Sequence, residues 1–132
     1  MKPLVERIDH LVLTVSDIEA AAQFYAQNLG LEREFFRGPE GQPRHALCFG
    51  DQKINLQDPS TDTPTKARAP TFGSGDFCLI AAVPLDEVVA HLNARGVEIE
   101  TGPVARRGAR GPMRSIYFRD PDGNLVEVAE YD

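Results

Sequence analysis

The chain has 132 residues, of which 42% are hydrophobic and 26% are charged, and its formal net charge is -6. This length allows one domain with a substantial core, and the composition is typical of a globular protein. Because general binding to nucleic acid or to an anionic membrane needs a basic face, we expect neither as a partner.

The first half of the chain predicts a strand, a helix and three further strands. The first strand covers residues 8–15. The helix follows it, with Ser16 and Glu19 as a capping box at its start and Gly30 at its end. The three short strands are predicted at 31–37, 45–50 and 52–57.

The second half repeats this order after an irregular segment. Residues 58–75 contain three prolines, four threonines and two glycines, which predicts a linker. A strand at 76–83 follows, and then a helix that Pro84 begins. Asp120–Asn124 has the composition of a turn. The last strands are predicted at 97–101, 114–119 and 125–130.

These elements predict an α+β fold of two βαβββ modules within a single domain. The first module covers residues 1–57, residues 58–75 are the linker, and the second module covers 76–132. One helix covers one face of each small sheet, so the other face stays open. That open face needs cover from a partner module, a ligand or both.

A repeat relates the two modules more closely. Gly30 follows His10 by 20 residues, and Gly96 follows Asp76 by 20 residues. Each glycine begins a similar tripeptide, Gly-Leu-Glu in the first module and Gly-Val-Glu in the second. Asp76 therefore stands where His10 stands, and two modules related by a pseudo-twofold could aim their side chains at one point.

Alternation along the strands places four polar side chains on the open faces. They are His10, Asn55, Asp76 and Glu127, and the last two strands of the modules match Asn55 with Glu127 within one residue. One imidazole, two carboxylates and an amide oxygen suit a divalent ion such as Mn, Fe(II), Ni or Zn. From the pattern alone, His10 could equally be a structural polar group, Asp76 a turn cap and Glu127 a solvated side chain.

Four arginines cluster in residues 105–114, which we expect to form a loop leading to the open face. Arginine binds carboxylate or phosphate in a bidentate manner, so Arg106 and Arg110 are candidates for binding an anionic substrate. The alternative is a solvated loop. Of the other histidines, His45 is expected to line the pocket or to be solvated, and His91 is expected to be structural.

Cys48 and Cys78 lie in apolar runs and predict buried, reduced thiols rather than a disulfide framework. The first 30 residues show no signal-peptide pattern, and no apolar run is long enough to span a membrane. We therefore expect a cytoplasmic protein.

Three segments resemble the vicinal-oxygen-chelate superfamily, which includes glyoxalase I, extradiol dioxygenases and the fosfomycin- and bleomycin-resistance proteins. They are Asp9–Val15, the helix containing Phe24-Tyr25 and ending Leu29-Gly30-Leu31, and Ile116–Glu127. Residues 49–56 and 102–106 resemble more closely the glyoxalase-domain-containing group, which is similar to lactoylglutathione lyase.

The resemblance implies that the open faces of two modules form a cup around one divalent metal. Its ligand positions match His10, Asp76 and Glu127. Asn55 falls where glyoxalase I has a metal-binding glutamate that moves a proton, and relatives have histidine at the position of Gln57. The resemblance thus implies Asn55 and Gln57 as residues that line the pocket, and it implies a homodimer whose site draws ligands from one chain or from two.

Three functions follow as hypotheses. The first is a glyoxalase I-like lyase or isomerase, in which Glu127 accepts a proton and the metal stabilises an enediolate. Its substrate would be a small, anionic carbonyl compound or thiol adduct. The second is an Fe(II) ring-cleaving dioxygenase, against which Asp76 counts because such sites have two histidines. The third is a drug- or ligand-binding protein without catalysis.

Overall fold

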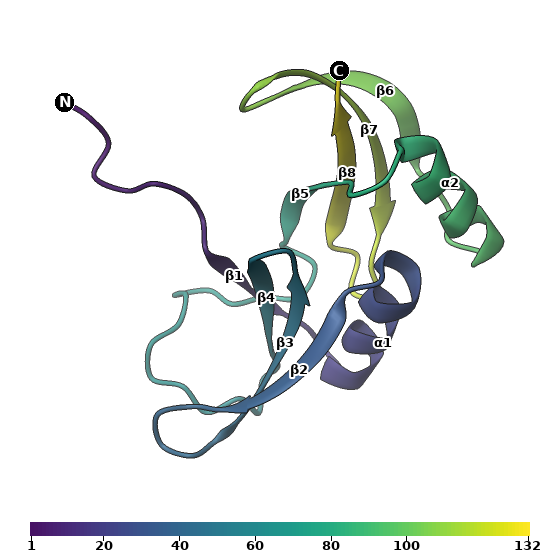
Figure 1. Ribbon diagram of the computed structural model, residues 1–132. Coiled ribbons are helices and arrows are strands. Elements are labelled where there is room, and N and C mark those ends of the chain that lie inside the picture. Colours follow the sequence, from purple (N-terminus) through teal and green to yellow (C-terminus); the bar gives the residue numbers. More distant parts are fainter.

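The computed structural model describes residues 1–132 and contains two four-stranded sheets, each with one helix (Figure 1). The sheet orders are β1-β4-β3-β2 and β5-β8-β7-β6. In each sheet the first and last strands of the module pair in parallel, and the other pairs are antiparallel. The α+β fold of two βαβββ modules is thus confirmed. The elements are β1 (His10–Thr14), α1 (Ile18–Leu29), β2 (Glu32–Arg37), β3 (Pro43–Phe49), β4 (Gln52–Gln57), β5 (Asp76–Ile80), α2 (Leu85–Ala94), β6 (Thr101–Gly108), β7 (Gly111–Arg119) and β8 (Leu125–Tyr131).

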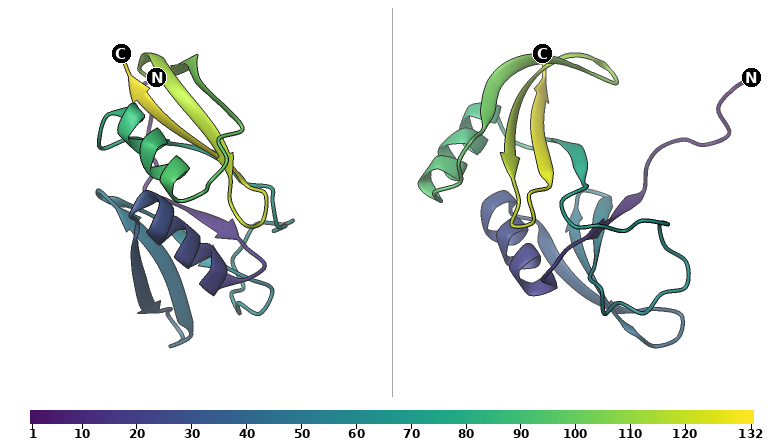
Figure 2. Two further views of the ribbon diagram at one scale, coloured as in Figure 1. Left: turned by 90° about the vertical axis from the view of Figure 1, so that its right-hand side faces the viewer. Right: turned by 180° about the vertical axis from the view of Figure 1, so that it is seen from behind.

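One hydrophobic core extends through both modules. The two helices lie next to each other on the same side of the molecule (Figures 1 and 2). The inward-facing side chains of both sheets pack with them, as strand alternation predicts. The largest fully buried members are Tyr25, Phe118, Leu47, Ile54, Leu85, Leu92 and Ile116.

The turn between β7 and β8 connects the two modules through buried hydrogen bonds. The Asp120 carboxylate accepts a bond of 2.7 Å from the Tyr25 hydroxyl of α1 and one of 2.8 Å from the Asn124 side chain. It also accepts from the backbone amides of Asp122 and Asn124. Asn124 Oδ1 in turn accepts from the Gly75 amide at 2.8 Å. Burial and the neighbouring Asp120 raise the pKa of Tyr25 far above its usual range, so this hydroxyl remains a donor.

Helix α1 begins one residue later than predicted. Asp17 is its N-cap, and the Asp17 carboxylate accepts a 3.1 Å bond from the Ala20 amide. The Ser16 amide instead donates to Asp122, and Glu19 pairs with Arg33, so the predicted capping box does not form. Gly30 ends the helix with a φ of 72°, as predicted.

The arginine-rich segment is a β-hairpin and not the predicted loop. β6 extends to Gly108 and β7 begins at Gly111, so only two residues form the turn. The glycines and charges of this segment are typical of a loop, which is why a loop was predicted. Pairing with β7 nevertheless supplies partners for its backbone hydrogen-bonding groups, so it forms a strand. The hairpin also moves the predicted strand at 97–101 to Thr101–Gly108.

Pro84 is the N-cap residue of α2 rather than its first helical residue. Residues 58–75 contain no helix or strand, as expected for the linker. Neither helix has the length and apolar character that a bilayer crossing requires.

Candidate active site on the open sheet faces

The registers of the two sheets place Asn55 and Glu127 at equivalent positions. Val12 on β1 pairs with Asn55 on β4, and Cys78 on β5 pairs with Glu127 on β8. Val12 and Cys78 each follow the first residue of their strand, His10 or Asp76, by two positions. The repeat in the sequence is therefore also a repeat of position on the open faces.

Three buried side-chain polar atoms lack a hydrogen-bond partner, and all three belong to the open faces. They are Asn55 Oδ1, Glu127 Oε2 and Ser115 Oγ. Ser115 lies in register with Ala129 on β8, two positions from the row that contains Glu127. A buried polar atom without a partner costs about 1–3 kcal/mol, so three of them on the open faces indicate a surface built to receive something else.

His10 and Asp76 line the same cavity of about 420 Å³, at the free edges of the two sheets. His10 Nδ1 lies 2.8 Å from the Asp9 carboxylate, and this bond lowers the pKa of Asp9. A carboxylate on one ring nitrogen fixes the orientation of an imidazole and leaves the other nitrogen for a ligand, as in many metal sites. Asp9 was not among the predicted site residues, although it is adjacent to His10 in the sequence.

Within one chain, no group of three or more His, Cys, Asp and Glu side chains is close enough together to hold a metal ion. One chain therefore brings His10 and Asp76 to a common cavity and places Glu127 on the strand next to β5, without gathering all three around a point.

Gln57 lies further along the open face of the first sheet. Its side chain is largely buried and donates a 2.9 Å hydrogen bond to Thr14 Oγ1. Both residues line a cavity of about 230 Å³ whose other walls come from the linker, including Lys66 and Phe72. Gln57 therefore lies beneath the linker, while Asn55 lies closer to His10 at the start of β1.

Of the two arginines predicted to bind an anionic substrate, Arg106 is the one that the fold brings toward Glu127. Its guanidinium stacks on the Tyr117 ring at 5.4 Å and its Nε donates a 3.1 Å bond to the Tyr117 hydroxyl. Tyr117 is the cross-strand neighbour of Glu127. Partial burial raises the pKa of Tyr117, Arg106 opposes the shift, and Glu127 adds to it. Tyr117 was not among the predicted site residues, although the alternation of β7 places it on the open face.

Arg110 lies at the other end of this face. Its guanidinium stacks on Tyr131 at 5.1 Å, and its amide donates to the Tyr131 hydroxyl. Tyr131 is four residues beyond Glu127 on β8, which corresponds to about 13 Å along an extended strand. The structure therefore brings Arg106 near Glu127 and leaves Arg110 at the hairpin tip.

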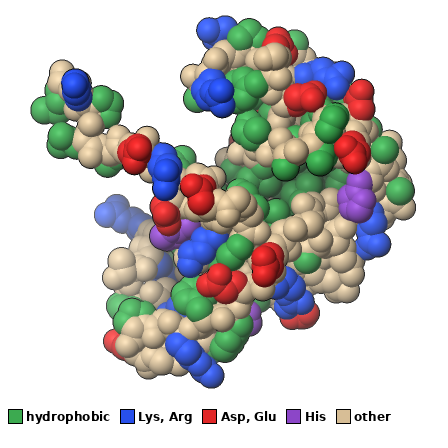
Figure 3. Space-filling view, in the orientation of Figure 1, with side chains coloured by type: hydrophobic (Ala, Val, Ile, Leu, Met, Phe, Trp, Pro, Cys, Tyr) green, Lys and Arg blue, Asp and Glu red, His purple; other side chains and the backbone are tan.

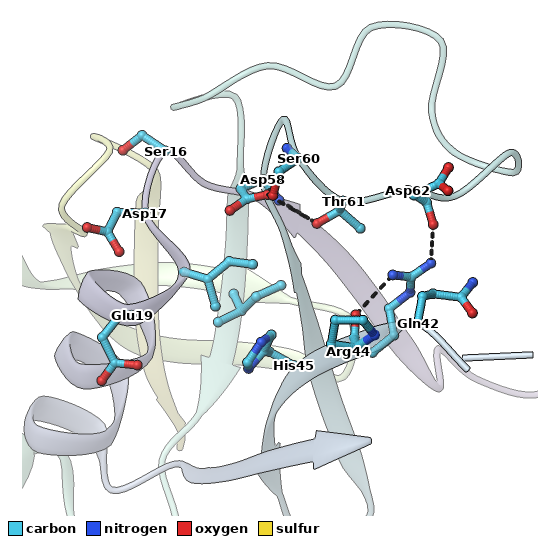
Figure 4. A pocket seen from close by; sticks show the side chains of 13 residues that line it. Ser16, Asp17, Glu19, Gln42, Arg44, His45, Asp58, Ser60, Thr61 and Asp62 are labelled. Carbon is cyan, nitrogen blue, oxygen red and sulfur yellow. Dashed lines mark hydrogen bonds between the residues drawn. The ribbon is translucent and has the colours of Figure 1, made fainter. Parts of the chain in front are cut away.

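His45 lines a different cavity, of about 550 Å³, beside the start of α1 (Figure 4). It pairs with Leu56, whose side chain is in the core, so His45 faces the helix side and not the open face. Three of the four acidic side chains around it already have partners: Asp17 caps α1, Glu19 binds Arg33 and Asp58 binds Ser60. His91 contacts the Gln27 carbonyl at 3.0 Å and so links α2 to α1, as expected for a structural histidine.

The two cysteines are free, as predicted, but neither is buried. Cys78 is exposed at the free edge of the second sheet, and Cys48 is half-buried beside Glu34. For Cys78 the prediction of burial failed because β5 has a neighbour on one side only, so an apolar run did not imply an enclosed strand. Although the residue as a whole is exposed, desolvation of its thiol and the neighbouring Glu127 raise the pKa of the Cys78 thiol to about 11.

This pKa predicts a slow reaction of Cys78 with iodoacetamide in the metal-free protein. At pH 8.5 a thiol of pKa about 11 is less than about 1% ionised, whereas an ordinary cysteine is about half ionised. We expect alkylation about 100-fold slower than that of free cysteine, and faster alkylation in Glu127→Gln. Peptide mass spectrometry over time, with Cys48→Ser to isolate the site, measures both rates. Equal rates in the two proteins would contradict the role of Glu127.

The sequence pattern of the Glyoxalase/Bleomycin resistance protein/Dioxygenase superfamily matches residues 7–128. The chain belongs to this superfamily. Among the proteins similar to the chain is virulence protein STM3117 of Salmonella typhimurium, 48% identical over 97% of this chain and 86% of that protein. Another is the glyoxalase domain-containing protein RDO1 of Mycosarcoma maydis, 42% identical over 96% of this chain and 69% of that protein.

Solved structures of similar proteins agree with the fold. The crystal structure of STM3117 has a TM-score of 0.90 over 98% of this chain and 100% of that one, at 45% identity. Lactoylglutathione lyase from Agrobacterium tumefaciens has a TM-score of 0.69 at 31% identity, over 98% and 96% of the two chains. TnmS3, an antibiotic binding protein from Streptomyces, has a TM-score of 0.75 at 25% identity, over 98% and 99%.

Proposed function

We propose that this protein is a metal-dependent, glyoxalase I-like enzyme that acts on a small anionic carbonyl compound or thiol adduct. One observation carries the proposal: buried oxygen atoms of Asn55 and Glu127 have no partner at equivalent positions of the two open faces. Each position lies on the strand beside a potential ligand, His10 or Asp76. The similarity to a lactoylglutathione lyase supports the reaction class.

The residues fit a divalent metal in their chemistry. His10 is already oriented by Asp9, Asp76 shares its cavity, and Glu127 has an unpartnered carboxylate oxygen. One imidazole and two carboxylates suit Ni, Zn, Mn or Fe(II). Because one chain does not gather the three, we propose that a homodimer completes the site with residues of both copies. Bound there, the ion would polarise a substrate carbonyl.

The remaining residues supply proton transfer and orientation. Glu127 is the general base, which takes a proton from the carbon beside the substrate carbonyl. An amide cannot act in this way, so Asn55 and Gln57 orient the substrate by hydrogen bonding. Arg106 holds the anionic end of the substrate, and Tyr117 fixes the position of its guanidinium.

Replacing Arg106 should weaken substrate binding, and replacing Arg110 should not. In Arg106→Ala the KM for the hemithioacetal of methylglyoxal and glutathione, which carries carboxylates, should rise about 10-fold or more because a charge-assisted bond is lost. Arg110→Ala removes the same charge from the hairpin tip and is the matched control. Metal content should not change in either variant. Equal KM values for all three proteins would remove Arg106 from the site.

The proposal is tested by metal analysis and an isomerase assay on the same preparation. We expect about one tightly held divalent ion for each site after purification without added metal, and formation of thioester from the hemithioacetal. Oxygen uptake with a catechol in the presence of Fe(II) would instead support the dioxygenase. A metal-free protein that binds an apolar drug would instead support the hypothesis of a ligand-binding protein without catalysis. The similarity to TnmS3, an antibiotic binding protein, is the observation that favours this alternative.

The location that fits this proposal is the cytoplasm. Cys48 and Cys78 are both free, and Cys78 is exposed. Unpaired exposed thiols persist in a reducing compartment.

A further inference from the structure

The linker encloses a cavity on the open face of the first sheet. Figures 1 and 2 show the linker as a wide arc on the side of this sheet that faces away from the helices. Beneath it lies the cavity of about 230 Å³ that Thr14 and Gln57 line from the sheet. Sites that hold a whole small molecule usually measure about 300–1,000 Å³. The cavity therefore has the size to receive one end of a ligand rather than all of it.

Gln57 offers this cavity an acceptor of fixed orientation. The residue exposes only 9% of its surface. Its amide nitrogen donates the 2.9 Å bond to Thr14 Oγ1, and no group of the chain donates to its Oε1. A glutamine carbonyl accepts hydrogen bonds from N–H and O–H groups. A ligand that reaches Gln57 therefore needs a donor at this point.

Asp58, the next residue, brings a negative charge to the same cavity. Its Oδ1 accepts hydrogen bonds from the Ser60 amide at 2.9 Å, the Ser60 hydroxyl at 2.6 Å and the Thr61 hydroxyl at 3.3 Å. The bonds from Ser60 and Thr61 lower the pKa of Asp58, and this carboxylate therefore stays ionised at neutral pH. Its other oxygen, Oδ2, has no partner in the chain, so the group can still accept from a ligand.

Lys66 brings a positive charge to the cavity from the linker, and the rings of Pro59, Pro70 and Phe72 are also part of its wall. None of the ion pairs of the chain includes Lys66 or Asp58. Figure 3 shows acidic and basic side chains intermingled over the first module, so neither sign of charge dominates this face. A cavity whose wall holds one anion and one cation, neither of them paired within the chain, matches a ligand that carries both charges.

From these observations we propose that the cavity binds the α-amino-carboxylate end of a ligand, with the ammonium on Gln57 Oε1 and Asp58 and the carboxylate on Lys66. The inference rests on the proposed function and deepens it, because it names the thiol part of the adduct as one with a free amino-acid end. Asn55 and Gln57 lie two residues apart on one face of β4, about 7 Å along the strand. An amino-acid end bound at Gln57 thus lets the rest of the substrate extend over Asn55.

The first test is an NMR titration of the ¹⁵N-labelled protein with S-methylcysteine, which carries the sulfur, ammonium and carboxylate of such a thiol and undergoes no reaction. We expect the amide signals within residues 57–61 and 66–72 to shift. N-acetyl-S-methylcysteine lacks the ammonium and S-methylcysteine methyl ester lacks the carboxylate. Each should bind at least about 5-fold more weakly, because a charge-assisted contact is lost. No shifts, shifts confined to other residues, or equal affinity for the three compounds would overturn the inference.

The second test uses Lys66→Met, which removes the charge and keeps much of the length of the side chain. Since Lys66 is exposed, the variant should stay folded, and it should bind S-methylcysteine about 5-fold more weakly. Its affinity for the methyl ester, which has no carboxylate, should match that of the wild type. Lys2→Met is the matched control, because Lys2 is exposed near the N-terminus and does not line the cavity. Unchanged binding of S-methylcysteine in Lys66→Met would contradict the role of Lys66.

Binding of S-methylcysteine needs neither metal nor turnover, so this inference and the proposed enzyme can fail separately. Binding by a protein without isomerase activity would reject the enzyme and retain the amino-acid site. Isomerase activity without such binding would retain the enzyme and reject the amino-acid site.

Discussion

Glu127→Gln is expected to lower kcat about 100-fold or more and to reduce the metal content of the purified protein. The substitution keeps the shape of the side chain but removes a carboxylate that we propose both as a metal ligand and as the general base. Loss of a general base alone costs a factor of about 100 to 10,000. Because Glu127 Oε2 has no hydrogen-bond partner in the chain, the amide breaks no such bond at that oxygen, and the folded state should be retained.

Glu98→Gln is the matched control for this experiment. Glu98 is exposed between α2 and β6, so its replacement removes one negative charge at a distance from the open faces. Elemental analysis and turnover of the hemithioacetal should distinguish the two variants. Full metal content and activity in Glu127→Gln would exclude Glu127 from both roles.

The second large effect is expected at Asp120, whose carboxylate accepts the buried hydrogen bonds that connect the two modules. Asp120→Ala should lower the free energy of unfolding by at least about 3 kcal/mol, because the Tyr25 hydroxyl, two backbone amides and the Asn124 side chain all lose their acceptor in a buried place. Tyr25→Phe removes only the hydroxyl and should cost about 1.5–3 kcal/mol, the range for a hydrogen bond to a charged group.

Urea denaturation at one fixed protein concentration measures these differences, since the proposed dimer would make stability depend on concentration. Tyr131→Phe is the control, because its hydroxyl is partly exposed and receives only the Arg110 amide. We expect that variant within about 0.5 kcal/mol of the wild type. A similarly small change in Asp120→Ala would mean that the shared core alone holds the modules together.

Local sequence rules predicted the features of the fold that depend on neighbouring residues. Alternation in β1 and β4 assigned His10 and Asn55 to one face and the core residues to the other, because a strand has a strict period of two. Gly30 ended α1 for an equally local reason, its φ of 72°. The predicted N-cap of α1 was wrong by one residue, because Ser16 and Asp17 are adjacent and both side chains can cap a helix. The hydrogen bond from the Ser16 amide to Asp122 in the other module accompanies the choice of Asp17.

The parts that sequence did not predict depend on pairing between distant strands. Composition alone could not distinguish the β6–β7 hairpin from a loop. Only pairing with β7 makes this segment a strand, and only then do Arg106 and Arg107 lie on opposite faces of a sheet. The same register sets Tyr117 beside Glu127 and Ser115 beside Ala129. Strand alternation and the resemblance to a family supplied the candidate metal-ligand positions, whereas the neighbours of those positions came from the structure.

The equivalence of Asn55 and Glu127 has a consequence for how chemistry can change on this scaffold. The two sheets have two equivalent strand positions at which an acidic side chain could stand. This chain has a carboxylate, Glu127, at one of them and an amide, Asn55, at the other. Moving the acid from one half to the other needs two side-chain exchanges and no rearrangement of strands. For the proposed reaction, a duplicated module would thus give selection a choice of the face of the planar enediolate to which the proton is returned, and so a route to products of opposite handedness.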